Sequence, residues 1–288
     1  MRNIPADDSL AVAVVFAIHN GDVNGLQRLL NENPDLATAR IVNARGGSRT
    51  LLHIVADWPG HFPNGARTVA VLIAAGAEVN AAVIPGTPSA HAETALHWAA
   101  SSDDVAVLDA LLDGGADIEA PGAVFTGGAP MSDAVVFAQW RAARRLLERG
   151  ARTTLTQAAA LGLLDRVKEY CIGRPPPSPD EVTGAFWHAC RGGQRQTADY
   201  LLGMGANLNW IGWGQCTPLQ AAQQSGVSDL IEWLRSRGAL SAKESSQCAA
   251  PDASNYLVSP ARGPPGAVHI SLRARQRPTG GHLVPRPS

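Results

Sequence analysis

Three stretches of eight residues, TLLHIVAD at 50–57, TALHWAAS at 94–101 and TPLQAAQQ at 217–224, align with one another without a gap. Each begins with threonine, has leucine two residues later, and carries His or Gln at its fourth position. A second apolar helical pattern follows each stretch and ends in Gly-Ala, at 76–77, 115–116 and 238–239. The chain therefore contains an internal repeat, and a repeat decides the fold before any single motif does.

Weaker copies of the same two-part pattern fill the intervals between these stretches. In the register set by the clear copies, units start near residues 12, 50, 94, 129, 153, 184 and 217. Most of the intervals between these starts are between 31 and 44 residues, and one, from 129 to 153, is only 24. The sequence thus predicts seven units.

Each unit has the features of two short helices joined by a turn. The first threonine can cap the first helix, and small residues such as Ala99 and Ala100 allow close helix packing. The second helix carries a leucine pair, as at Leu111 and Leu112, and ends at a residue that tolerates a left-handed backbone. Those end residues are Asn33, Gly76, Gly115, Gly150, Gly205 and Gly238. A unit this short cannot bury its own apolar face, so the units must stack.

This pattern resembles the ankyrin-repeat family, whose units are about 33 residues long and carry the motif T-P-L-H-x-A. TPLQAAQQSG, and TALHWAA with LLDGGADIE, are the copies most similar to it. The resemblance implies an all-α solenoid of stacked helix-turn-helix units over residues 1–240, with β-hairpin or loop fingers between units. It also implies a binding scaffold, because this fold serves many unrelated partners.

Departures from the repeat predict irregular parts of the array. DWPGHFPNGAR at 57–67 is a predicted surface loop, and the connection 81–93 is a predicted long finger. The short fourth interval leaves no room for a finger, and GRPPPSPDE at 173–181 reads as a semi-rigid spacer. We therefore expect units one to four and six to seven to form two blocks joined at an atypical fifth unit.

Residues 241–288 differ in composition from the repeats. They hold six basic and two acidic residues, many prolines and no apolar periodicity, so we expect a disordered Pro/Arg-rich tail. RARQR at 273–277 is a candidate for binding an acidic surface or nucleic acid, although a solvated tail is the favoured interpretation.

Composition excludes several classes of function. The formal net charge of −1 gives no reason to expect nucleic acid as a partner. No apolar run approaches the roughly 20 residues that span a bilayer, and the four cysteines lack metal-binding spacing. We expect a monomeric cytoplasmic protein with no membrane contact, cofactor or metal. The two lysines against 22 arginines favour a bacterial origin.

Candidate catalytic groups also have structural explanations. The resemblance implies that His53 and His97 bridge backbone groups of the repeat turn. His188 and Cys190 are two residues apart on a predicted helix and so point in different directions. The glycine clusters lack the spacing of phosphate-binding loops. Four arginines share one helix with Glu148 and are expected to be a solvated helix face: Arg141, Arg144, Arg145 and Arg149. We therefore predict that the protein is not an enzyme.

The resemblance places partner contacts on the finger tips and the ends of the first helices, along the concave face. Aromatic and arginine side chains there are the best candidates, because such residues dominate binding energy at interfaces. The candidates are Trp58, Ser101, Phe125, Arg191, Trp213, Gln223 and Gln224. We expect the other tryptophans at 98, 187 and 233 to be packing residues. In NWIGW at 209–213, Trp210 is expected to pack and Trp213 to point outward.

Three functions remain open from the sequence. The first is a scaffold that binds a partner protein on its concave face. The second is a module that captures a peptide or flexible tail, with the segments 57–67 and 81–93 as clamps. The third, which we disfavour, is an enzyme or small-ligand protein built on a repeat scaffold. For the first two functions we expect no small-molecule substrate.

Overall fold

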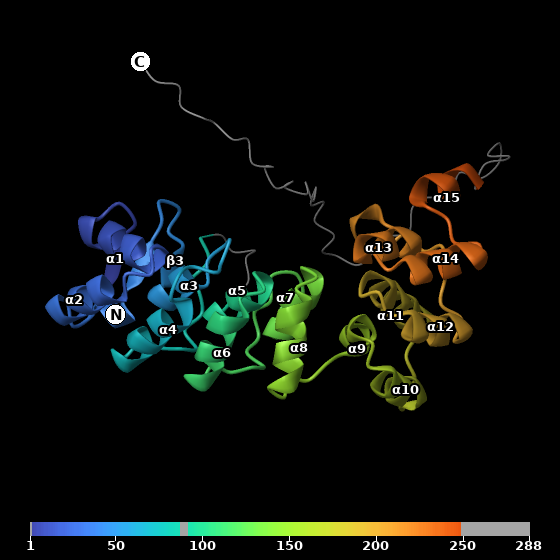
Figure 1. The fold of residues 1–288 in the computed structure, drawn as a ribbon, viewed down its shortest axis with the longest axis horizontal. Coiled ribbons are helices and arrows are strands. Elements are labelled where there is room, and N and C mark those ends of the chain that lie inside the picture. Colours follow the sequence, from blue (N-terminus) through green and yellow to red (C-terminus); the bar gives the residue numbers. More distant parts are fainter. Residues whose placement is uncertain (1, 87–91, 249–288) are drawn as a thin grey trace, which may run out of the picture.

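The computed structural model describes residues 2–86 and 92–248, and these form seven helix pairs in a row (Figure 1). The first helices are α1 (Ser9–His19), α3 (Leu51–Val55), α5 (Ala95–Ser101), α7 (Pro130–Val136), α9 (Leu155–Leu161), α11 (Pro179–Arg191) and α13 (Pro218–Ser225). The second helices are α2 (Val23–Glu32), α4 (Gly65–Ala74), α6 (Val105–Asp113), α8 (Trp140–Glu148), α10 (Leu164–Ile172), α12 (Arg195–Gly203) and α14 (Ser228–Ser236). First helices pack on first helices and second on second, so the predicted solenoid is confirmed.

A hydrogen-bonded turn starts most of the first helices. In α5, Thr94 and His97 form a capping box, in which the His97 Nδ1 accepts from the Thr94 backbone N–H at 3.1 Å. The other imidazole nitrogen of His97 bonds the Gly128 carbonyl oxygen of the next connection at 3.2 Å. His53 makes the same pair of contacts with Thr50 and with the Glu93 carbonyl oxygen. Both imidazoles are buried, so they bridge backbone groups as the resemblance implies.

The ends of the second helices have the predicted left-handed residue in five units, and unit one differs from the prediction. Gly115, for example, has a φ of 90°, and this left-handed backbone ends the helix and directs the chain into the next connection. Asn33 was expected to play this part in unit one, but its φ is −133°, so that expectation is wrong. The Asn33 side chain instead donates to the Leu29 carbonyl oxygen at 3.0 Å, and a 3₁₀ turn, η1 (Leu36–Thr38), follows.

The first two fingers are joined by backbone hydrogen bonds. The first finger is a hairpin of β2 (Arg40–Val42) and β3 (Ser48–Thr50), and β1 (Asn3–Pro5) pairs in parallel with β2. The second finger continues this sheet, because Ser48 and Ile84 exchange N–H···O bonds of 2.8 and 2.9 Å. The strand β1 has no counterpart in the repeat pattern and was not predicted.

The predicted loop at 57–67 lies between α3 and α4 and is fixed to both neighbouring units. The His61 backbone N–H donates to Asp104 at 2.7 Å, towards unit three. The Asn64 side chain donates to the Gly21 carbonyl oxygen at 2.9 Å, towards unit one. The loop is therefore a fixed part of the surface in this structure, and α4 begins within it at Gly65.

The buried apolar core consists of two clusters that meet in α9. One extends from Ile4 to Leu161, and the other contains Ala158, Ala159 and the buried side chains of units six and seven. α9 packs mainly on α11 and only slightly on α7 and α8. The fifth unit therefore belongs with units six and seven, and the joint lies before it, where Figure 1 shows a long single connection from α8 to α9.

Two segments differ from the expected boundaries. The sixth first helix starts at Pro179, five residues before the expected 184, because Ser178 and Glu181 form a capping box. The last residues of the predicted spacer are thus helical. α15 (Ala242–Cys248) occupies the start of the expected tail at 241–288, and Glu244 pairs with Arg235 at 3.1 Å. Residues 249–288, including RARQR, lie outside the described residues.

The four arginines near α8 do not form a simple solvated face. Arg145 contacts Asp109 of α6 at 2.7 Å, and Arg149 contacts Asp109 and Asp113 at 2.8 and 2.7 Å. These contacts link the second helices of units three and four, which corrects the expected role of Arg145 and Arg149. Arg141 is mostly exposed, at 72% of its side chain.

We expect His53 to make folding sensitive to acid. Burial lowers the pKa of His53 from 6.5 to about 4, so the neutral ring stabilises the fold fully above pH 6.5. That contribution is lost as the pH falls from 6.5 to 4, by up to about 3 kcal/mol. In His53→Gln, the new glutamine can make the same capping contact in unit two that Gln157 makes in unit five. Unlike the histidine, it does not titrate. Denaturant unfolding at pH 7.5 and 4.5 should show a smaller loss of stability for this variant, and an equal loss would contradict the assignment.

The joint before α9 should separate two cooperative units. We expect native-state hydrogen exchange to give one opening free energy for α5–α8 and a different one for α9–α14, because few contacts cross the joint. The Gln157 amide donates to Ser132 Oγ across it at 3.0 Å, so Gln157→Ala should widen the difference. A single shared opening free energy, unchanged by Gln157→Ala, would show that the array unfolds as one unit.

Candidate partner-binding face

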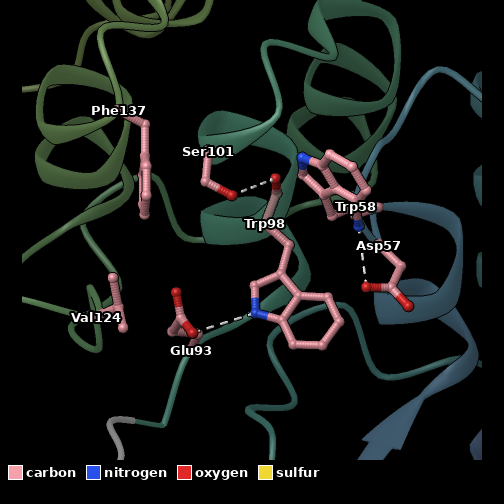
Figure 2. A pocket seen from close by; sticks show the side chains of 8 residues that line it. Asp57, Trp58, Glu93, Trp98, Ser101, Val124 and Phe137 are labelled. Atoms are coloured by element: carbon pink, nitrogen blue, oxygen red, sulfur yellow. Dashed lines mark hydrogen bonds between the residues drawn. The ribbon is translucent and has the colours of Figure 1, made fainter. Parts of the chain in front are cut away.

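The ends of the first helices of units two to four surround a small pocket (Figure 2). Its volume is about 180 Å³, and it is lined by Ala56, Asp57, Trp58, Glu93, Trp98, Ser101, Val124 and Phe137. Figure 2 shows Phe137 and Val124 on one side and Asp57 and Trp58 on the other, with Trp98 and Glu93 between them. Three successive units therefore build this pocket, and no single unit contains it.

Aromatic side chains form the walls of the pocket. Trp58 is 71% exposed and Phe137 is 37% exposed. Phe125, which is 47% exposed, lies against Phe137 with ring centroids 5.8 Å apart. The Trp98 indole packs edge-on against His53 and on the core, while its Nε1–H donates to Glu93 at 3.3 Å. Trp98 thus packs, as expected, and also lines the pocket.

Carboxyl groups lie at two places around the pocket. Asp57 forms an ion pair with Arg49, so its charge is compensated. Glu93 interacts with Asp133, a carboxyl group that is 1% exposed and lies behind the pocket. The Val124 backbone N–H donates to Asp133 Oδ1 at 3.2 Å, whereas Oδ2 receives no hydrogen bond from the described residues. Burial and the Glu93 charge raise the pKa of Asp133 to about 8.

A second cluster of aromatic side chains lies on units six and seven. Trp213 is 55% exposed, and its ring centroid is 5.3 Å from that of Trp187 and 5.3 Å from that of Trp210. His188 lies 4.9 Å from Trp213, and burial lowers the pKa of His188 to about 4. The imidazole is therefore neutral and contributes an aromatic surface. Trp210 is half-buried against the core, and η2 (Trp213–Gln215) carries Trp213.

Arg191 connects the two clusters. Its guanidinium lies 5.7 Å from the Trp187 ring centroid, and it donates to the Val135 carbonyl oxygen at 3.4 Å. Val135 belongs to α7, two residues before Phe137 at the pocket. We call the surface formed by the exposed or half-buried side chains of both clusters the aromatic face: Trp58, Ser101, Phe125, Phe137, Arg191 and Trp213.

The sequence candidates fall on or beside this face. Trp58 and Ser101 line the pocket, Phe125 adjoins it, and Arg191 and Trp213 belong to the second cluster. Gln224 contacts the Cys216 sulfur at 3.8 Å, and Gln223 is exposed on α13 near it. The sequence did not single out Glu93 and Asp133, because they are distant in sequence and only stacking brings them together.

The part of the chain that the structure describes contains cysteines and possible metal ligands. The thiols of Cys171 and Cys190 are buried, which raises the pKa of each and keeps it protonated. Within residues 2–86 and 92–248, no cluster of His, Cys, Asp and Glu has the geometry to hold a metal ion. No helix of that part is long and apolar enough to cross a membrane.

Comparison with known proteins agrees with the repeat. The family model of the ankyrin repeat matches residues 92–123, which contain α5 and α6. A search of curated proteins found no match. Among solved structures, the human ASB11 ankyrin repeat domain is similar at 20% identity, over 77% of this chain and 96% of that one, with a TM-score of 0.46. The chain therefore contains an ankyrin repeat at residues 92–123, and the helix pair of that repeat recurs in seven units of the described structure.

Proposed function

We propose that this ankyrin-repeat protein is a non-enzymatic scaffold that binds a partner protein on its aromatic face. Ankyrin repeats generally mediate protein–protein interaction, and the fold is typically not catalytic. The observation that supports this face is its exposed aromatic side chains, at Trp58, Phe125, Phe137 and Trp213. Large apolar side chains gathered on one surface are typical of interaction sites, and single scattered ones are not.

The aromatic face also has the form that interfaces require. Aromatic rings supply contact area at low conformational-entropy cost. Tryptophan, tyrosine and arginine are the residue types whose truncation most weakens binding. The pocket between units two and four can receive one protruding side chain, because its 180 Å³ lies well below the roughly 300 Å³ of small-molecule sites. This size favours a polypeptide partner over a cofactor or metabolite.

Capture of a peptide or flexible tail is the second candidate function. A fixed loop wall and a pocket for one side chain suit an extended segment as well as a folded partner. A synthetic peptide that matches the partner's affinity would favour this mode. A peptide that binds much more weakly than the partner protein would favour a folded partner that contacts the whole face.

We expect Trp58→Ala to weaken binding of a protein partner by about 30-fold, since truncation of a hot-spot aromatic costs about 2 kcal/mol. The partner would first be captured from the native host and then measured by calorimetry. Ile172→Ala is the matched control, because Ile172 is 78% exposed but lies at the end of α10, away from the face. Equal losses in both variants, or no loss in either, would exclude this face as the binding surface.

Trp210→Ala and Trp213→Ala should differ in their effects. Trp210 is half-buried against the core of units six and seven, so we expect its truncation to lower the free energy of unfolding by about 2 kcal/mol. Trp213 is more than half exposed, so its truncation should mainly weaken partner binding. Denaturant unfolding and calorimetry on both variants provide the measurements. The same loss of stability in both would show that the two rings act as one packing unit.

A further inference from the structure

The pocket on units two to four has a chemical character beyond its apolar walls. The rings of Trp58, Trp98 and Phe137 line it together with Glu93, whose carboxyl interacts with that of the buried Asp133. Among the described residues, no basic side chain lines the pocket, and the nearby Arg49 is engaged with Asp57. Aromatic faces beside a carboxylate attract a cation both through the ring quadrupole and through charge.

The buried Asp133 carboxyl adds to the acidic character of this region. It is 1% exposed, and its Oδ2 receives no hydrogen bond from the described residues. A buried polar atom of this kind is rare in folded proteins, and it marks either a functional site or a bound group. What Asp133 does meet is a second carboxyl, that of Glu93, which also accepts from the Trp98 indole. A positively charged occupant beside Glu93 would offset the repulsion between the two carboxyl groups.

We propose that this pocket binds the cationic side chain of an arginine or lysine presented by an extended basic segment of the partner protein. This inference rests on the proposed function, because it names the chemistry of the partner at the same face. An acidic side chain would be repelled by Glu93, and an apolar side chain would cover that carboxylate without adding an opposite charge. A pocket of about 180 Å³ has room for one such side chain and little more.

Occupation by a cation should release a proton. In the empty pocket, burial and Glu93 raise the pKa of Asp133, so the pair holds one proton near neutral pH. A bound cation favours the deprotonated pair, and affinity should therefore rise with pH up to about 8, by at most tenfold per unit. The two described histidines near the pocket, His53 and His97, are buried, and burial lowers the pKa of each below this range.

The test is an NMR titration of the full ¹⁵N-labelled chain with a capped pentapeptide that contains one arginine between alanine and glycine residues. The Trp98 indole N–H, which donates to Glu93, reports on the pocket, and Trp98→Phe assigns its resonance. We expect a saturable shift with a dissociation constant at least tenfold lower than that of the citrulline peptide, its neutral analogue. The dissociation constant of the arginine peptide should also be lower at pH 8 than at pH 6. Equal affinity of the two peptides, or no shift with either, would overturn the proposal.

Variants of the acidic pair sharpen the test. Glu93→Gln should weaken binding of the arginine peptide at least tenfold. Asp133→Asn should remove the pH dependence of that binding while retaining the hydrogen bond from Val124. Glu78→Gln is the matched control, because Glu78 is exposed and does not line the pocket. Thermal unfolding of each variant confirms that it is folded. A Glu93→Gln protein that binds like Glu78→Gln would exclude charge recognition.

Two further experiments distinguish this proposal from binding of the chain's own basic segment and from the proposed function alone. Replacement of Arg273, Arg275 and Arg277 by glutamine in the full chain should leave the peptide affinity unchanged. Tighter binding after that change would overturn the assignment to a partner, since the chain's own basic segment would then be the competitor. A partner protein that depends on Trp58 but binds equally to Glu93→Gln would overturn this inference and leave the proposed function standing.

Discussion

The bond that joins one unit to the next is made by the buried side chain at the fourth position of the repeat motif. His53 and His97 each accept from the threonine backbone that starts their helix and reach a carbonyl oxygen at the start of the following unit. In units five and seven a glutamine amide makes the same turn. Gln157 donates to Ser132 of the preceding unit, and Gln220 accepts from the Ala242 backbone N–H of α15. Because a helix pair this small cannot bury its apolar face alone, these contacts act as nearest-neighbour interface terms in the units that have them.

The pocket arises where this device is missing. Unit four has Ala129 and Ser132 at the positions of the threonine and histidine, and no capping box forms. The helix start is held instead by Asp133, which accepts the Val124 N–H from the preceding connection. That substitution places a buried carboxyl beside Glu93, the residue whose carbonyl oxygen is bound by His53. The unusual chemistry of the face is thus a consequence of a departure from the repeat.

The repeat made most of the fold predictable, whereas the site depended on stacking. Seven helix pairs, the histidine bridges and the burial of Trp187 and Trp233 follow from local pattern, because each is set within one unit or by its register. Trp58, Ser101 and Phe125 could be chosen as candidates from their register positions. Asp133 and the strand β1 could not, because their partners lie in other units and no periodic signal connects them. Asn33 was mistaken for a left-handed helix stop because the tolerance of a residue type does not compel its conformation.

The aromatic face differs in charge along its length, and this limits how a partner can lie on it. Glu93 and Asp133 lie at the pocket of units two to four, whereas Arg191 lies beside the cluster of units six and seven. Arg191 also bonds a backbone carbonyl of α7 across the joint between the two core clusters. A segment that spans both clusters therefore meets acidic groups at one end and a guanidinium at the other, so only one direction of the chain matches both. Since that segment would also cross the joint before α9, binding and the relative position of the two blocks are coupled through the same arginine.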